Sequence, residues 1–495
     1  MMIYPLTQIV LLPICLSPLV YLIRKKFERI GNWLSFIILL YCTVIGFLVA
    51  FDYFVKAKPI VEEFEWAPTV GLYFGFRADG LSIPVMLIIL LLSLATSVYS
   101  IAYMEHKHRV ELYFSLYLLY TAGMVGTVLA TNLIEFYLFW ELMLISSYFL
   151  IAEWGYGERE KVSFKYFMYT HVGALLLLIG ILSVYVSLGT FNIYEIPVRV
   201  NHGSIPYETV LSIIIPMTIG IFVKMAVVPL HTWLPDAHAE APTPISMLLS
   251  GVMIECGVYA FNRLIISCFY NYFVNLSNFL IILAVITMFY GGIMALVQLD
   301  IKRLLAYSSI SQIGYMLLGM STGTYLGLVG SVYHILSHAC AKGLLFACAG
   351  AIMHQTGGKR DIRELGGLVR VMPYTTLLFA IGVFSLAGVP TFAGFISEFM
   401  IFLGGFEKAR GYGLAVIALA VICVVLTTAY GLWALKRIFF GPIKRELKNV
   451  REAPLVMLVP MSFLALLNFI LGLYPEPTVA ILETWAKNVV VLASQ

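Results

Sequence analysis

The chain has 495 residues, of which 61% are hydrophobic and 12% are charged. A soluble domain of this length needs far more charge to cover its surface, so the composition predicts an integral membrane protein. The formal net charge of +4, with no Lys/Arg-rich tail, gives no indication of nucleic-acid binding. The seven cysteines lie mostly in apolar stretches and show neither CxxC nor Cys/His ligand spacing. We therefore expect this chain to bind no metal and no redox cofactor of its own.

Apolar stretches of about 18 residues or more follow one another along the chain, separated by charged residues or turn signals. They predict an all-α membrane protein with about fourteen transmembrane helices and no soluble domain. The whole chain, residues 1–495, is then a single polytopic membrane domain. The expected spans, in chain order, are 3–23, 31–55, 79–103, 112–130, 132–152, 164–189, 209–232, 243–268, 276–298, 303–320, 323–353, 372–404, 411–435 and 454–475.

Basic residues are distributed unevenly between the two sets of alternate loops. One set holds 21 of the 31 Lys and Arg residues, whereas the set on the side of the N-terminus holds seven. Because basic loops stay on the cytoplasmic side, this bias predicts that both termini lie outside. We expect a multi-pass protein of the plasma membrane, N-out and C-out. The first basic cluster follows the first apolar stretch, which is typical of a membrane span and not of a cleavable signal.

Proline interrupts two of the expected spans close to an ionisable residue. Pro229 follows Lys224 by five residues, and Pro390 precedes Glu398 by eight. Proline breaks or kinks a helix, and a broken helix near the midplane is typical of transporters. These breaks fall in helices 7 and 12, at corresponding places in two blocks of five helices that we expect to be inverted repeats. The expected divisions are 3–103 for helices 1–3, 112–268 and 276–435 for the repeats, and 454–495 for the C-terminal helix and tail.

Five charged residues lie inside apolar spans: Glu141, Lys224, Glu255, Lys342 and Glu398. A charge at membrane depth costs roughly 3 kcal/mol on insertion scales, so such residues mark ion pathways or proton relays by default. We expect Glu141 and Lys224 to pair between two helices, since each lowers the cost of burying the other. A static structural ion pair is the alternative. Glu398 is an isolated carboxylate and is expected to be a terminal gate.

Two histidines follow Lys224 in the stretch PLHTWLPDAHAEAPTP. His231 and His238 lie there with Asp236 and Glu240 among several prolines. Histidine exchanges protons near neutral pH, so this stretch is a candidate for proton transfer. A wet, polar turn between helices is one alternative. Metal binding is another, although the residues show no recognisable ligand spacing.

A second group of histidines lies on one expected helix. His334, His338 and Lys342 recur every fourth residue and form a stripe roughly 12 Å long. A row of protonatable groups through hydrocarbon suits proton hopping through intervening water. The alternative is that each histidine stays neutral and donates a hydrogen bond to a neighbouring helix.

Glu255, Tyr259 and Arg263 share one helical face, at i, i+4 and i+8. This spacing predicts an internal Glu255–Arg263 pair, with a local salt bridge of no functional role as the alternative. Arg77 and Asp79, before the third span, are expected to be interfacial charges.

These residues are embedded in motifs that resemble the antiporter-like subunits of respiratory complex I. The resemblance extends to multisubunit sodium/proton (Mrp-type) antiporters and membrane-bound hydrogenases, and it covers spans three to thirteen. Its strongest match is PLHTWLPDAHAEAPTPISMLLSGV, from Pro229 to Val252. Further matches are FWELMLISSYFLI around Glu141, KYFMYTHVGALLLLIG, DIKRLLAYSSISQIGY, SHACAKGLLFACAG around Lys342 and SLAGVPTFAGF around Pro390.

The resemblance implies proton translocation coupled to a redox partner or to a sodium gradient. By position it implies that Glu141 and Lys224 are the coupling pair, that His334, His338 and Lys342 form the central relay, and that Glu398 faces the exit. The family usually carries a lysine where this chain has Glu255. Implied partners are other membrane subunits, redox subunits with iron–sulfur or nickel–iron centres, protons and, as a second ion, sodium.

Three other functions stay open from the sequence. The first is the D-type member of a stand-alone multisubunit cation/proton antiporter. The second is a structural or quinone-site scaffold, and the third is a secondary transporter for an organic substrate. In the favoured interpretation it is an ion-translocating, non-catalytic subunit of an oxidoreductase complex such as an NADH dehydrogenase or a membrane-bound hydrogenase.

Overall fold

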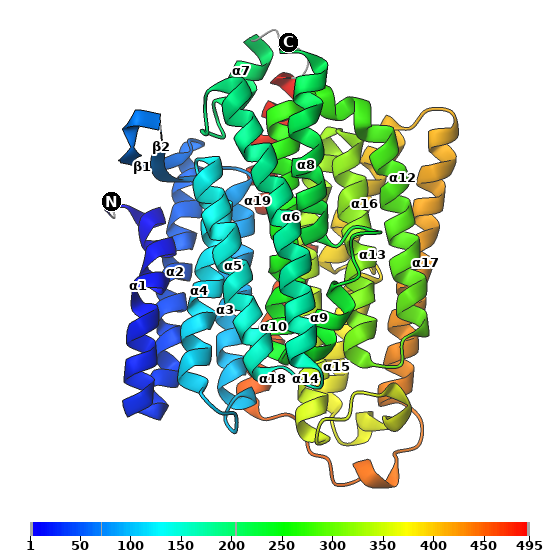
Figure 1. The fold of residues 1–495 in the computed structure, drawn as a ribbon. Helices are drawn as coiled ribbons and strands as arrows, with labels where there is room; N and C mark the ends of the chain where they lie inside the picture. The colour runs from blue at the N-terminus through cyan, green and yellow to red at the C-terminus, as the bar shows by residue number, and fades with distance from the viewer. Residues whose placement is uncertain (1–2, 71, 203–204, 493–495) are drawn as a thin grey trace.

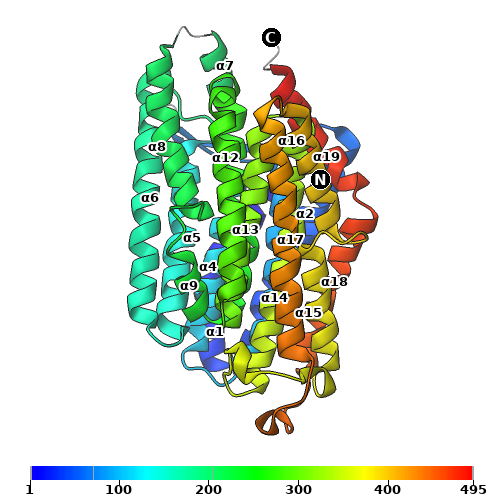
Figure 2. The same ribbon diagram turned by 90° about the vertical axis from the view of Figure 1, so that its right-hand side faces the viewer.

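The computed structural model describes residues 3–70, 72–202 and 205–492. The ends of the expected domain and tail, residues 1–2 and 493–495, lie outside this range. Long, roughly parallel helices form one bundle (Figures 1 and 2). Among the described residues, eleven helices are long and apolar enough to span a membrane. The all-α, multi-pass membrane fold is therefore confirmed, whereas the count of fourteen and the inverted repeats stay predictions.

The helices follow the expected spans closely. They are α1 (Pro5–Lys26), α2 (Glu28–Lys56), α3 (Ser82–Tyr103), α4 (Val110–Leu129), α5 (Leu133–Trp154), α6 (Arg159–Leu188), α7 (Ile196–His202), α8 (Tyr207–Met225), α9 (Leu234–Glu240), α10 (Thr243–Leu248), α11 (Glu255–Ala260), α12 (Ser267–Val297), α13 (Ile301–Thr322), α14 (Tyr325–Gln355), α15 (Pro373–Leu386), α16 (Ala393–Lys408), α17 (Tyr412–Phe439), α18 (Leu455–Leu473) and α19 (Glu476–Leu492).

One helical segment is much longer than a bilayer is thick. Thr243–Val297 has 55 residues, or about 80 Å at 1.5 Å per residue, so it must change direction. The chain does so at Phe269, whose φ of −133° and ψ of 36° are not helical. Before this kink, α10 and α11 alternate with two π-helical segments, Leu249–Met253 and Phe261–Ile266.

The helical path of the chain is interrupted near Pro229 and Pro390, the two prolines at which breaks were predicted. Between α8 and α9 lies a turn in which Ala226 is left-handed, with a φ of 58°. Between α15 and α16, Thr391 has a φ of 85°. The Nε1 of Trp233 donates to the carbonyl of Val223 at 2.9 Å, which satisfies a backbone group near the first break. A protein group thus replaces a lost helical hydrogen bond at the first interruption, whereas Pro390 and Thr391 at the second are exposed at the surface of the bundle.

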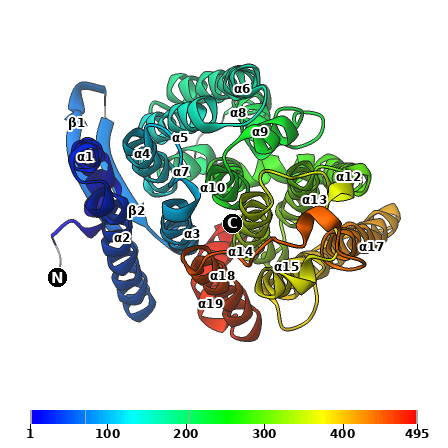
Figure 3. The ribbon, with the colours of Figure 1, turned by 90° about the horizontal axis from the view of Figure 1, so that it is seen from below.

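A β-hairpin between α2 and α3 is an element that the sequence analysis did not predict. Strands β1 (Ile60–Ala67) and β2 (Leu72–Ala78) pair antiparallel with Ile60 opposite Ala78. Seen along the helices, the hairpin lies with α1 and α2 at one edge of the bundle (Figure 3). A search for apolar stretches long enough to span a membrane misses strands this short.

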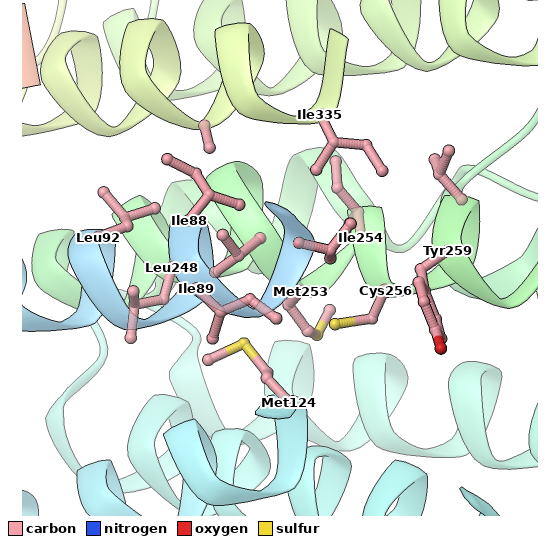
Figure 4. Packing of buried hydrophobic residues seen from close by; sticks show 14 of the residues in the cluster. Ile88, Ile89, Leu92, Met124, Leu248, Met253, Ile254, Cys256, Tyr259 and Ile335 are labelled. Atoms are coloured by element: carbon pink, nitrogen blue, oxygen red, sulfur yellow. The ribbon is translucent and has the colours of Figure 1, made fainter. Parts of the chain in front are cut away.

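Helix α14 forms the centre of the bundle. Every residue in its most apolar 18-residue stretch is buried, whereas only 28% of the corresponding stretch of α17, at the edge of the bundle, is buried. Apolar side chains from α3, α4, α14 and the Thr243–Val297 segment pack together beside α14 (Figure 4). The labelled members of this cluster are Ile88, Ile89, Leu92, Met124, Leu248, Met253, Ile254, Cys256, Tyr259 and Ile335. Any polar side chain on α14 must therefore find its partner within the protein.

Two helices begin against a carboxylate from a distant part of the chain. Glu62 of β1 accepts hydrogen bonds from the backbone of Leu6 and Thr7, both at 2.8 Å, in the first turn of α1. Glu452 likewise accepts from the backbone of Tyr374 at 2.8 Å and of Thr375 at 3.3 Å, at the start of α15. A carboxylate at this position satisfies orphan N–H groups and interacts favourably with the helix dipole.

We expect Glu62→Ala to destabilise the packing of α1 by about 1 kcal/mol, the usual cost of losing a helix cap. Thermal unfolding in detergent, together with proteolysis between α1 and α2, measures the effect. Glu65→Ala is the control, because Glu65 is an exposed residue of the same strand. Equal stability of the two variants would contradict the capping role.

Candidate functional site

The histidine–lysine stripe predicted on one helix lies entirely inside the bundle. His334, His338 and Lys342 are on α14 and are at most 1% exposed. The ring centroids of the two histidines are 6.3 Å apart with nearly stacked planes. Three titratable groups are thus aligned along the most completely buried of the candidate membrane spans.

His338 forms a hydrogen bond through its Nδ1 to Glu255 Oε1 on α11, with both side chains fully buried. The predicted Glu255–Arg263 pair is therefore wrong. Arg263 instead donates through Nη2 to Asp79 Oδ1 at 2.6 Å and through Nε to Tyr259 Oη at 3.0 Å. The π-helical segment Phe261–Ile266 begins between Tyr259 and Arg263 and alters the helical spacing on which that prediction rested. Asp79 is consequently the partner of a buried guanidinium and not only an interfacial charge.

Lys342 is held by α13. Its Nζ donates to the carbonyl of Leu305 at 3.0 Å and to the hydroxyl of Ser308. Within the described residues, no carboxylate lies within 4.0 Å of this ammonium group. Neutral acceptors alone therefore solvate Lys342, which leaves its protonation sensitive to changes in nearby charge.

His334 connects three helices. Its Nδ1 is 2.8 Å from Ser397 Oγ on α16, and its Nε2 is 2.8 Å from Gln312 Oε1 on α13. The ring of Tyr315 stacks against it, with centroids 6.0 Å apart. Both ring nitrogens are occupied, so passage of a proton to or from His334 requires one of these hydrogen bonds to rearrange.

Glu398 lies one residue from Ser397, against the break between α15 and α16. A Cβ placed on Gly388 would be 2.5 Å from Glu398 Oε2, so the carboxylate occupies the space that this glycine leaves. Gly388 also has a φ of +64°, which favours glycine. The Oε1 of Glu398 is buried and has no hydrogen-bond partner among the described residues. The break thus brings a carboxylate with free acceptor capacity next to the hydrogen bonds of His334.

The structure does not place Glu141 and Lys224 in direct contact, so the predicted ion pair is absent between these two described residues. Glu141 Oε2 is instead 3.3 Å from Nδ1 of His171 on α6, a residue that the sequence analysis did not single out. Lys224 is 2% exposed, and its Nζ lies 5.3 Å from the centroid of Trp140. Its ammonium has no hydrogen-bond acceptor among the described residues. Lys224 is therefore a buried cation with an aromatic face as its neighbour.

His238, in the last turn of α9, and His231, just before α9, have different surroundings. His238 is fully buried and stacks on Phe346 of α14, with centroids 4.9 Å apart. Neither of its ring nitrogens has a hydrogen-bond partner in the described structure. His231 is 5% exposed and contacts Tyr290 edge-on at 4.7 Å. Of the two, His238 lies against the helix that bears the stripe.

Charged residues that the sequence analysis did not single out fix the position of α9. Lys302, at the start of α13, is fully buried and donates to the carbonyls of Ala239, at 3.4 Å, and Ala241. Arg360 binds Asp300 at 2.9 Å and Glu240 at 3.4 Å. The DIKR motif contains Asp300 and Lys302, which is a signal available from the sequence.

In the described part of the chain, no three His, Cys, Asp or Glu side chains come together as metal ligands.

Two models of known sequence families match this chain. One, described as "NADH:quinone oxidoreductase/Mrp antiporter, TM", matches residues 130–427, more than half of the chain. The other, "NADH-Ubiquinone oxidoreductase (complex I), chain 5 N-terminus", matches residues 66–114. The chain belongs to this antiporter-like family. The resemblance found in its motifs is thereby confirmed.

Members of the family from bacteria and archaea are similar over nearly the whole chain. NADH-quinone oxidoreductase subunit M of Rhodobacter capsulatus is 33% identical over 476 residues, covering 91% of this chain and 88% of that protein. F(420)H(2) dehydrogenase subunit M of Methanosarcina mazei is 30% identical over 495 residues, 98% of each. In the solved membrane-bound sulfane sulfur reductase, an archaeal respiratory membrane complex, one chain superposes with a TM-score of 0.86 at 28% identity, covering 95% of this chain and 76% of that one.

Asp236 connects α9 to two other helices. It accepts hydrogen bonds from Lys165 of α6 at 2.7 Å and Arg303 of α13 at 2.9 Å. It lies outside the candidate membrane spans. Partial burial alone would raise the pKa of this carboxyl, but Lys165 and Arg303 hold it below its ordinary value.

We expect Asp236→Asn to increase hydrogen–deuterium exchange in α9 at pH 7. A carboxyl with a lowered folded-state pKa stabilises the fold above the unfolded pKa, about 3.9, and loses this effect as the pH falls through the folded-state value. The native chain should therefore keep α9 protected from pH 8 down to pH 5 and lose the protection only below about 3.9. Loss of protection between pH 7 and pH 5 would contradict this assignment.

Proposed function

We propose that this chain is the proton-translocating subunit of a complex I-like membrane assembly. Membership of the antiporter-like family supports this function. The observation that carries the proposal is the fully buried row of His334, His338 and Lys342 on α14, with Glu255 bonded to its middle member. Burying charged and titratable groups in a nonpolar bundle costs free energy, and apolar packing would hold the helices together at lower cost. Such groups therefore indicate an ion pathway.

In the proposed route, protons enter from the cytoplasmic side near Lys224 and His238. They cross the centre through Lys342, His338 and His334 and leave by Glu398. His238 supports the first step, since it packs on α14 and both of its nitrogens are free for hydrogen bonding within the described structure. Ser397 bonds His334 and is adjacent in sequence to Glu398, which supports the last step.

Transfer between neighbouring groups in this route needs either water or a rearrangement of hydrogen bonds. Direct proton transfer requires heavy atoms about 2.6–3.2 Å apart. Lys224 has no partner in the described structure, so it is free to move toward Glu141 or toward the central row as nearby charges change. We infer that this freedom, and not a fixed Glu141–Lys224 ion pair, couples the chain to the rest of its assembly.

The partners of the chain are other membrane subunits, as in the complexes of its relatives. We propose redox subunits with iron–sulfur or nickel–iron centres as the source of driving force. The D-type member of a stand-alone cation/proton antiporter, with sodium as second ion, is the alternative, because the matching family description names both kinds of protein.

We also propose the N-out, C-out orientation in the plasma membrane and the two inverted repeats, 112–268 and 276–435. The loops after α14 and α17, rich in basic residues, lie together at one end of the bundle, which agrees with a cytoplasmic face there (Figure 1).

We expect Lys224→Ala and Glu141→Gln to abolish proton uptake by vesicles that contain the native assembly, while the assembly still forms. The reason is that each variant removes a titratable group that is buried or half-buried in the bundle and leaves its neighbours intact. Proton uptake is measured with a pH-sensitive dye, once with a reductant and once with an imposed sodium gradient. Lys161→Ala is the control, because Lys161 is a surface residue whose side chain is 78% exposed. Full proton uptake in both variants would refute the proposed coupling role.

Glu255 provides a separate test of the central row. We expect Glu255→Gln to lower proton uptake by about 100-fold, the usual order for loss of a proton-transferring group. The amide has the size of the carboxylate and can still bond His338, so assembly and thermal stability should change little. Glu208→Gln, on α8 near an end of the bundle, is the matched control. Unchanged uptake would limit Glu255 to a structural role.

A further inference from the structure

A cavity of about 310 Å³ opens at one end of the bundle. Its walls come from the end of α2, from β2, from α7 and from α19, and none of the nine predicted site residues lines it. Helix α2 ends at Lys56 and α3 begins at Ser82, so the cavity lies where these apolar spans end. In a membrane this is the level of the lipid headgroups.

The charges in the cavity wall do not balance. The wall contains one carboxylate, Asp79, and two guanidinium groups, Arg77 and Arg263. Asp79 binds Arg263 at 2.6 Å, while Arg77 Nε is 3.7 Å from its second oxygen. The side chain of Arg263 is only 5% exposed and is fixed by Asp79 and Tyr259. The wall thus carries one excess positive charge, on Arg77.

One donor in this wall also lacks an acceptor. Arg77 lies over the ring of Tyr194, 3.8 Å from its centroid, which fixes the plane of the guanidinium group. Its Nε is shielded from solvent and has no hydrogen-bond partner among the described residues. The side chain is nevertheless 28% exposed, and the planar guanidinium group matches the oxygens of a phosphate that meets this exposed part.

The rest of the cavity favours an amphiphile over a free ion. Ala57, Pro59, Ile193 and Val198 contribute apolar walls, and Val198 is 56% exposed at the rim. Around the same end of α2, Phe51 and Val55 are 68% and 65% exposed. An inorganic phosphate ion would leave these surfaces uncovered. We propose that the cavity binds an anionic phospholipid, with its phosphate on Arg77 and its acyl chains along the apolar surface.

Lipid retention by the purified full-length chain tests this proposal. The chain is stripped of lipid in detergent, supplied with phosphatidylglycerol or phosphatidylcholine, and analysed by native mass spectrometry. We expect Arg77→Gln to weaken retention of phosphatidylglycerol about tenfold, the scale of a lost charge-assisted contact. Arg199→Gln should have no effect, because Arg199 of α7 pairs with Glu195 at 2.8 Å and does not line the cavity.

A second variant keeps every charge in place. Val198→Trp would fill the rim from an exposed position, and it should lower phosphatidylglycerol retention as much as Arg77→Gln does. Equal retention by Arg77→Gln and Arg199→Gln would overturn the site. Binding of inorganic phosphate with no gain for phosphatidylglycerol would overturn the lipid assignment, and so would a neighbouring protein found over the cavity in the native assembly. None of these outcomes depends on whether the chain moves protons.

Discussion

The hydrogen bond between Glu255 and His338 lies in the fully buried centre of the bundle, and it shows the constraint that shapes this fold. A carboxylate or an ammonium group in a nonpolar interior needs a partner, since an isolated charge there is far less stable than one in water. Each buried titratable group on α14 meets this need differently: His338 with Glu255, Lys342 with a carbonyl and a hydroxyl, and His334 with Ser397 and Gln312. These contacts connect α11, α13 and α16 to α14.

The two helix interruptions extend the same principle to the backbone. At the first, the Nε1 of Trp233 donates to the carbonyl of Val223, and Lys302 and Arg360 donate to the Ala239 carbonyl at the far end of α9. At the second, Gly388 leaves room for the Glu398 carboxylate. Each break therefore brings polar groups to a depth at which an unbroken helix would offer none. Membership of the antiporter-like family is consistent with this arrangement, because an ion that crosses the bundle needs such groups at its middle.

Much of this structure could be predicted from the sequence, because bilayer thickness and the cost of buried charge leave few alternatives. Apolar stretches located the helices, and Pro229 and Pro390 indicated where they break. The partners of the charges could not be derived in the same way. Spacing along one helix suggested that Glu255 binds Arg263. In the structure, Glu255 instead bonds His338 of another helix, and Arg263 binds Asp79 in the turn before α3. His171 and Lys302 were missed because their importance depends on what lies opposite them, and the hairpin was missed because its strands are short.

If the row of buried groups on α14 carries protons and does not merely hold the helices together, loss of one protonatable group must stop proton uptake. Lys342→Met tests it most directly, since methionine preserves the length and packing of the side chain but cannot be protonated. Assembly on native gels and proton uptake by vesicles are measured on the same preparation. We expect an intact assembly with no proton uptake. A failed assembly, or an intact one that still takes up protons, would contradict it.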